Sequence, residues 1–214
     1  MHQSVKNLIS IKKELESISN KLPSIIAVSK TFSISNILPL IDYGHVHFGE
    51  NKVQEALEKW KNIKEQFSQI KLHMVGKLQS NKVKFALPLF DFIHSLDNEK
   101  LAKKIATEQI KYQKKPKIFI QVNIGDEDQK SGIDKNDLNE LISYCKDINL
   151  NVVGLMCIPP LNDDSIKYFK EMNELNKNYN FNELSMGMSS DYLKAIQCQA
   201  TFVRIGSNIF GLRS

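Results

Sequence analysis

The sequence predicts an α/β protein that folds as a single (β/α)8 barrel, a TIM barrel, with one extra helix before the first strand. Three observations predict this class. Short apolar, β-branched runs alternate with amphipathic helical stretches along almost the whole chain, which is typical of parallel sheets. Eight such units follow one another with short connections, which favours a closed barrel over an open sheet. Finally, the first strand is apolar without interruption, as a strand buried on both faces requires.

The opening elements are an amphipathic helix over residues 3–19 and a strand over Ser24–Val28, with Lys30 directly after it. A second short strand over residues 46–48 ends in a Gly-Glu-Asn sequence. The clearest helix of the chain follows over residues 53–67, because its apolar residues return on one helical face.

The later elements repeat this pattern of apolar strand, polar loop and amphipathic helix. Ser80 and Asn81 are helix-start residues, so a helix is expected from there through Leu87. Further strands are expected at 72–76, 92–95, 118–123, 152–156, 183–187 and 202–205. Further helices are expected at 99–111, 137–145, 165–175 and, as a short one, 191–198.

Length and composition point to one soluble domain spanning residues 1–214, since 214 residues with 42% hydrophobic content can bury one sizeable core. The net charge of +5 is spread along the chain rather than gathered in a stripe, so we expect no nucleic-acid partner. We find no leader-like segment and no run long enough to cross a bilayer. Three widely spaced cysteines suggest neither disulfides nor a thiolate metal site, which fits the cytoplasm.

Lys30 is the first candidate for chemistry. At the carboxyl end of the first buried strand it should point into the barrel mouth, where barrels of this kind place their active sites. Desolvation there lowers the pKa of a lysine and makes the neutral amine available for Schiff-base formation. A solvated surface lysine is the alternative interpretation.

Two serine-bearing loops predict a phosphate site. Gly206, Ser207 and Asn208 follow the eighth strand, and residues 187–190, Gly-Met-Ser-Ser, follow the seventh. Barrels often bind phosphate with these two loops and a short extra helix, because glycine admits a close backbone approach and hydroxyls donate to an anion. A simple turn is the alternative for either loop alone.

Arg204 is the third candidate. Only Arg204 and Arg213 are arginine among 29 basic residues, so an arginine here should serve where its planar fork is needed. Arg204 lies two residues before the last glycine loop and should therefore be near the same ligand. Polar residues at other strand ends, such as Ser95 and Asn123, should also face the mouth.

Histidines and a cysteine suggest two competing sites. His45 and His47 should share one strand face, with His73 on the neighbouring strand, so we considered a metal site. Without a fitting carboxylate or cysteine spacing, core or surface histidines are the preferred interpretation. Cys157 could be a nucleophile only with a base beside it, and the sequence identifies none.

Several strings together resemble the pyridoxal phosphate homeostasis protein family, also described as YggS or PROSC. The resemblance runs from about residue 5 to the end and its motifs occur in family order. The strings are AVSKT at 27–31, FGENKVQEA at 48–56, HMVGKLQSNK at 73–82, VNIGDEDQKSG at 122–132, GLMCIPP at 154–160, LSMGMSSD at 184–191 and VRIGSNIFG at 203–211.

The resemblance implies the fold type III barrel of pyridoxal 5′-phosphate (PLP) proteins, like the N-terminal domain of alanine racemase without its second domain. It implies that Lys30 binds PLP covalently as a Schiff base and that Arg204 faces the pyridine nitrogen. The remaining implied contacts are Ser189, Gly206 and Ser207 at the phosphate, Asn51 near the ring, and Ser185 as a weaker phosphate candidate.

This chain departs from the family pattern at three positions. Lys52 replaces a usual tyrosine and Lys77 a common proline, which leaves the rim of the pocket open to question. Ser207 replaces a threonine and keeps the hydroxyl. The racemase histidine after the sixth strand has no counterpart in this sequence.

The resemblance implies a PLP-binding protein that sequesters the cofactor, delivers it to apo PLP-enzymes and has no turnover of its own. We expect it to be a monomer rather than a dimer. The alternative is a single-domain amino-acid racemase, against which we note that Ser214 follows closely on the last motif and leaves no domain to supply a second base. A Schiff-base aldolase without cofactor is a third possibility.

Overall fold

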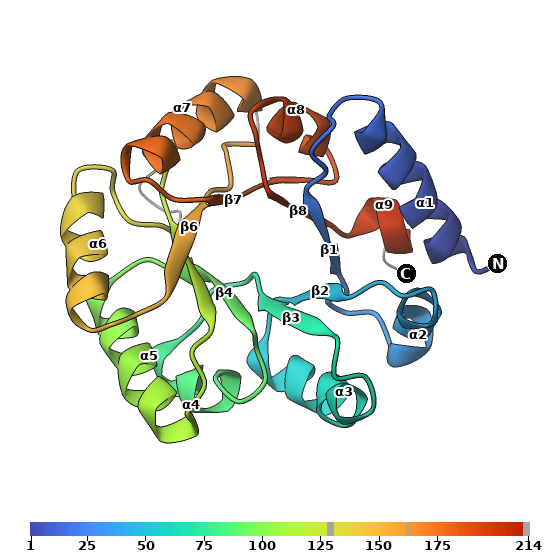
Figure 1. Cartoon of the computed structure of the whole chain (residues 1–214), viewed down its shortest axis with the longest axis horizontal. Coiled ribbons are helices and arrows are strands. Elements are labelled where there is room, and N and C mark those ends of the chain that lie inside the picture. The colour runs from blue at the N-terminus through green and yellow to red at the C-terminus, as the bar shows by residue number, and fades with distance from the viewer. Residues whose placement is uncertain (128–130, 162, 212–214) are drawn as a thin grey trace.

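A computed structural model describes residues 1–127, 131–161 and 163–211. Eight parallel strands follow one another around a closed barrel, which β1 and β8 close by pairing with each other, and helices surround it (Figure 1). The predicted (β/α)8 barrel is confirmed. The strands are β1 Ser24–Val28, β2 His47–Glu50, β3 Lys71–Met74, β4 Phe92–Leu96, β5 Lys117–Gln121, β6 Val152–Met156, β7 Glu183–Met188 and β8 Phe202–Ile205.

The helices of the described ranges lie outside the strands. They are α1 Gln3–Glu16, α2 Ile34–Asp42, α3 Val53–Gln66, α4 Val83–Ala86 after a 3₁₀ turn at Ser80–Lys82, α5 Glu99–Tyr112, α6 Leu138–Asp147, α7 Ser165–Asn178, α8 Tyr192–Gln197 and α9 Ser207–Phe210. None of these helices combines the length and apolarity needed to cross a membrane.

Alternation along the strands separates two apolar layers. In β1, Ile26 and Val28 face the barrel interior, whereas Ile25 and Ala27 face the helices. The interior layer contains Ile26, Val28, Phe92, Phe119, Met156 and Phe202. Because successive side chains of a strand alternate between faces, the residue two after Val28 also falls on the interior side, at the mouth.

Helix α1 is amphipathic and rests on the last helix of the barrel. Its apolar residues Val5, Leu8, Ile11 and Leu15 recur on one face and are buried. The Asn7 side-chain amide donates to the carbonyl of Ile209 in α9 at 3.0 Å, and Figure 1 shows the two helices side by side. The extra helix therefore supports the element that follows β8.

Like the short helix α9, helix α2 was not predicted from the sequence. Proline 39 lies inside it, and a proline within a helical pattern normally signals a break. The helix forms nevertheless, because it buries Ile37, Leu40 and Ile41 against the barrel. Strand β2 also differs from expectation, since it starts at His47 and includes Gly49 and Glu50.

Candidate functional site

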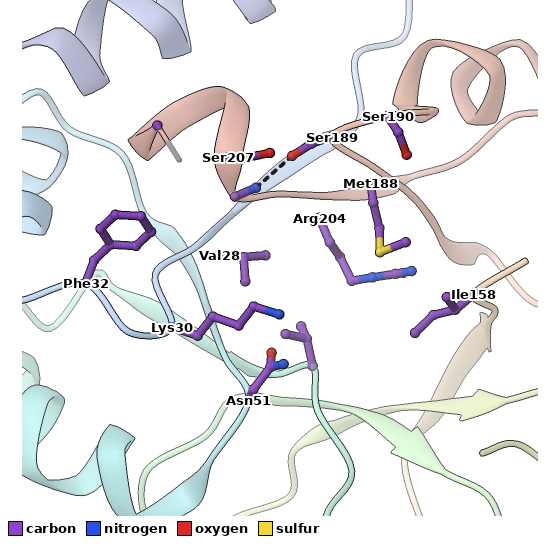
Figure 2. Close-up of a pocket in the computed structure, with 13 residues that line it drawn as sticks. Val28, Lys30, Phe32, Asn51, Ile158, Met188, Ser189, Ser190, Arg204 and Ser207 are labelled. Carbon is purple, nitrogen blue, oxygen red and sulfur yellow. Dashed lines mark hydrogen bonds between the residues drawn. The ribbon is translucent and has the colours of Figure 1, made fainter. Parts of the chain in front are cut away.

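A cavity of about 710 Å³ opens at the carboxyl ends of the strands (Figure 2). Its walls come from the ends of β1, β7 and β8 and from the loops after β2, β3 and β6. The lining residues are Val28, Lys30, Phe32, Asn51, Val75, Ile158, Met188, Ser189, Ser190, Arg204, Gly206, Ser207 and Gly211. This is where the chemistry of such barrels is found.

Lys30 lies two residues beyond the end of β1 and extends into the cavity, as Figure 2 shows. The turn behind it is held in a fixed conformation. Thr31 has a positive φ of 69°, which is uncommon for a residue with a side chain. Its backbone N–H donates to Glu55 Oε1 at 2.6 Å, and this bond stabilises the turn.

The residue before Lys30 is anchored by a buried carboxylate. Glu50 Oε1 accepts hydrogen bonds from the Ser29 hydroxyl at 2.7 Å and from Lys59 and Trp60 at 2.9 Å each. Lys59 also donates to the Ser29 carbonyl at 2.9 Å. Hydrogen bonds therefore hold the backbone on each side of Lys30, at Ser29 and at Thr31. Oε2 of Glu50 is buried without a partner among the described residues.

The opposite wall is a rim of small polar groups. The Gly206 N–H donates to Ser189 Oγ at 3.2 Å, which joins the loops after β7 and β8 (Figure 2). In the described part of the chain, the backbone N–H groups of Ser207 and Asn208 donate no hydrogen bond. Together with the Ser207 hydroxyl, these N–H groups can donate hydrogen bonds to an anion at the rim.

Arg204 projects from β8 beneath this rim and is 5% exposed. Its guanidinium donates to Ser185 Oγ at 2.7 Å and to the Cys157 carbonyl at 2.9 Å. Burial lowers the pKa of Arg204, but a guanidinium stays charged at neutral pH. Across the described ranges it forms no salt bridge.

Asn51 enters the cavity from the loop after β2, beside Lys30 in Figure 2. Its backbone lies against Gly76, where a Cβ atom would stand 2.4 Å from the Asn51 carbonyl oxygen. A glycine is therefore required at 76 to let the end of β3 approach this loop.

The charge and shape of the cavity define its ligand. Two cationic side chains, Lys30 and Arg204, line it, and no acidic side chain of the described residues does. Apolar side chains from Val28, Val75 and Ile158 cover the space between them. The cavity thus suits an anion with a flat or apolar body, placed between an amine and a rim of donors.

Some residues expected at the mouth lie elsewhere. Ser185 is fully buried, and its hydroxyl contacts Arg204 and His94, so it lies beneath the cavity and is not among the lining residues. Ser95 lies inside β4 and is buried, and the Asn123 side chain donates to the Glu127 carbonyl. Arg213 lies outside the described residues.

The two family departures, Lys52 and Lys77, do not line the cavity. Both are exposed and border a separate, smaller groove beside α3. Neither side chain is therefore part of the wall of the main cavity.

The histidines form a hydrogen-bonded row through the barrel interior. His47 Nδ1 lies 2.9 Å from His73 Nε2, and His73 Nδ1 lies 2.9 Å from His94 Nε2. His45 does not share their face, because it precedes β2 and packs against Phe48. In the described ranges, no group of three or more ligand-type side chains is arranged to hold a metal ion.

These histidines predict a loss of stability in mild acid. Burial lowers the pKa of His45 to about 4, and it lowers the pKa of His73 and His94 well below 6.5. Below pH 6.5 the unfolded chain therefore binds protons that the folded chain does not, so the free energy of unfolding falls as the pH falls. Each histidine contributes up to about 1.4 kcal/mol per pH unit. Urea unfolding at pH 7.5, 6 and 5 measures this, and equal stability at all three would contradict it.

The sequence did not single out Phe32, Val75, Ile158 and Met188 as lining residues. Except for Phe32, these residues end strands or follow them closely, so the alternation of side chains along the strands predicts several of them at the mouth.

The Cys157 thiol is buried, which raises its pKa to about 12 and leaves it unreactive.

Fold and site together define a class of (β/α)8 barrels. In this class a lysine after the first strand faces a rim of N–H and hydroxyl donors in the loops after the last two strands. A family model described as alanine racemase, N-terminal domain, matches residues 7–214. A pyridoxal phosphate homeostasis protein of Pasteurella multocida is 34% identical, over 100% of this chain and 94% of that protein. One of Aquifex aeolicus is 38% identical, over 88% and 86%.

Among solved structures, PipY of Synechococcus elongatus, determined with PLP bound, is 31% identical. It superposes with a TM-score of 0.89 over 98% of this chain and 100% of that one. The chain belongs to the pyridoxal phosphate homeostasis protein family, as its sequence motifs indicated.

Proposed function

We propose that this protein binds pyridoxal 5′-phosphate in the cavity, covalently through Lys30, and that it keeps the cofactor sequestered or delivers it to apo PLP-enzymes. The observation that carries the proposal is the pairing, in one cavity, of the Lys30 amine with a buried guanidinium and a rim of unpaired N–H donors. Family membership and the PLP-bound relative support it.

The residues present fit this group. Lys30 and Arg204 together supply two positive charges to a wall whose described residues include no carboxylate, which suits a phosphorylated ligand. A Cβ placed on Gly206 would lie 3.4 Å from the Val28 carbonyl oxygen, an ordinary contact. The apolar walls match the ring.

If bound here, the cofactor would supply an aldehyde, which is electrophilic toward a primary amine. Lys30 Nζ is the amine. The rim of Ser189, Gly206 and Ser207 would hold the phosphate oxygens, and Asn51 would lie near the ring. Arg204 would face the ring nitrogen and, as a permanent cation, would disfavour its protonation. An unprotonated ring nitrogen weakens the cofactor as an electron sink, which suits storage without turnover.

We further propose that the protein acts in the cytoplasm as a monomer and has no nucleic-acid partner. Buried, unpaired cysteines fit a reducing compartment. The recipients would be PLP-dependent apoenzymes.

Borohydride reduction followed by mass mapping tests the proposal. Reduction converts an imine to a stable amine, so the cofactor mass should be found on the peptide that contains Lys30. Finding it on another lysine, or finding none after incubation with PLP, would refute the proposal.

The rim predicts unequal effects of two substitutions. Ser207→Ala should weaken cofactor retention modestly, because one hydrogen bond to a charged acceptor contributes about 1.5–3 kcal/mol and the backbone donors remain. Gly206→Val should weaken retention more, because its side chain fills the space that a phosphate needs. Gly206→Ala is the matched control, since the protein itself tolerates a Cβ there. Dialysis measures retention, and equal retention by wild type and Gly206→Val would place the phosphate elsewhere.

If the protein were a racemase, it would interconvert the two enantiomers of an amino acid, and we expect no such turnover. Racemisation needs a base on each face of the substrate, and of the described lining residues Lys30 is the one that carries an amine. Chiral chromatography after long incubation with alanine should show negligible conversion. A rate of about 1 s⁻¹ or more that is lost in Lys30→Ala would establish the enzyme instead.

A further inference from the structure

A row of polar side chains runs through the barrel interior from Arg204 toward the opposite end. We call Ser185, His94, His73 and His47 the histidine row. Ser185 Oγ is 2.7 Å from the Arg204 guanidinium and 2.9 Å from His94 Nδ1. The next two links, between imidazole nitrogens, are 2.9 Å each. The row connects residues from β2, β3, β4 and β7 to β8.

The row has a direction that Arg204 sets. A guanidinium has only donors, so Ser185 Oγ accepts from Arg204. The serine proton then has His94 Nδ1 as its partner, which makes that nitrogen an acceptor and His94 Nε2 the protonated one. By the same argument, His94 Nε2–H donates to His73 Nδ1, and His73 Nε2–H donates to His47 Nδ1. The reverse direction would leave the buried Ser185 proton without a partner among the described residues, which costs free energy.

The surroundings keep the row neutral. His73 and His94 are fully buried, and His73 stacks on Phe92 while His94 stacks on Phe119. Burial lowers the pKa of both, and the positive charges of neighbouring groups, including Arg204 at His94, add to the effect. His47 is only partly buried, at the start of β2, and Lys71, Lys117 and Asp91 lie near it.

We propose that the aligned dipoles of the histidine row stabilise the buried guanidinium of Arg204 and position it for the cofactor. Each imidazole turns its acceptor nitrogen toward the cation and its N–H away, so their dipoles are aligned. A carboxylate in this place would cancel the charge, whereas neutral dipoles stabilise the cation and leave its full charge facing the cavity. The row members are positioning residues, and the cofactor contact itself rests on the proposed function.

The first test needs no cofactor. Nitrogen-15 chemical shifts of the imidazoles, measured in the full-length protein near pH 7, report which ring nitrogen carries the proton. We expect the Nε2–H form, uncharged, for all three row histidines. His2, at the exposed start of α1, provides a solvent-exposed reference. An Nδ1–H form or a charged ring at His73 or His94 would overturn the proposal whether or not PLP binds.

The second test uses two amides that mimic different imidazole nitrogens. In His94→Asn the amide oxygen occupies the Nδ1 place and still accepts from Ser185. In His94→Gln the amide occupies the Nε2 place and the acceptor is lost. We expect apparent PLP affinity within about twofold of wild type for Asn and a roughly tenfold loss for Gln, the upper end of the effect of one neutral hydrogen bond.

A third comparison separates positioning from general stability. If His94 acts through Arg204, the Asn and Gln variants should give bound PLP different pH midpoints for its absorbance change, and this difference should vanish when Arg204→Met is added. A difference that persists in the Arg204→Met background, or equal behaviour of Asn and Gln with Arg204 present, would overturn the proposal. The tautomer measurement decides the matter if a variant fails to fold.

Discussion

Lys30→Ala should abolish covalent retention of pyridoxal 5′-phosphate while the barrel stays folded. Lys30 is partly exposed at the cavity wall, and the strand before it keeps its interior residues Ile26 and Val28. Removing the side chain therefore opens no core cavity. The imine needs a primary amine in the mouth, and no second lysine of the described chain lines the cavity.

The visible spectrum of the variant after incubation with PLP and gel filtration checks this expectation. Lys52→Ala is the matched control, since Lys52 is exposed on the neighbouring loop and lies outside the cavity wall. The control should keep the cofactor spectrum. An unchanged spectrum in correctly folded Lys30→Ala would remove Lys30 from the site.

Glu50→Ala should cause the largest loss of stability among the residues that support the site. The substitution deprives three buried donors, on Ser29, Lys59 and Trp60, of their shared acceptor. Breaking a buried charged pair from one side costs about 3–5 kcal/mol. For a chain of this size the melting temperature should fall by roughly 6–20 °C.

Glu50→Gln is the informative comparison. Its amide oxygen can replace Oε1 as acceptor, and the second carboxylate oxygen has no partner to lose among the described residues. The fall in melting temperature should therefore be smaller. Lys167→Ala, which removes an exposed ion pair with Asp163, should leave it nearly unchanged. Equal melting temperatures for Glu50→Ala and wild type would mean that the network does not hold the loop.

The alternation of side chains along the strands and the positions of the strand ends made much of the barrel predictable from the sequence. The apolar run of β1 fixed the position of Lys30, and the glycine loops after β7 and β8 marked the rim. These features are local, because strand alternation and the place of loops in a barrel follow from sequence spacing.

The unpredicted features depend on contacts between distant segments. Helix α2 forms around Pro39 because tertiary burial outweighs its poor propensity. Ser185 was a weaker phosphate candidate, and the contact of its hydroxyl with Arg204, on the neighbouring strand β8, appears only in the folded structure. Glu50 was not singled out because its partners Lys59 and Trp60 lie on α3, outside the strand. His94, a histidine within a buried strand, marks the polar row in the barrel interior.

The pairing of β1 with β8 has a consequence for how the protein is made. The amine comes from the first strand, and the guanidinium and the rim come from the last two. A nascent chain on the ribosome therefore carries Lys30 early but has no binding site until β8 has emerged and closed the ring. Such long-range closure is among the slower steps of folding. An unfinished chain should thus neither capture the cofactor nor be stabilised by it, and the reactive aldehyde is taken up only by completed molecules.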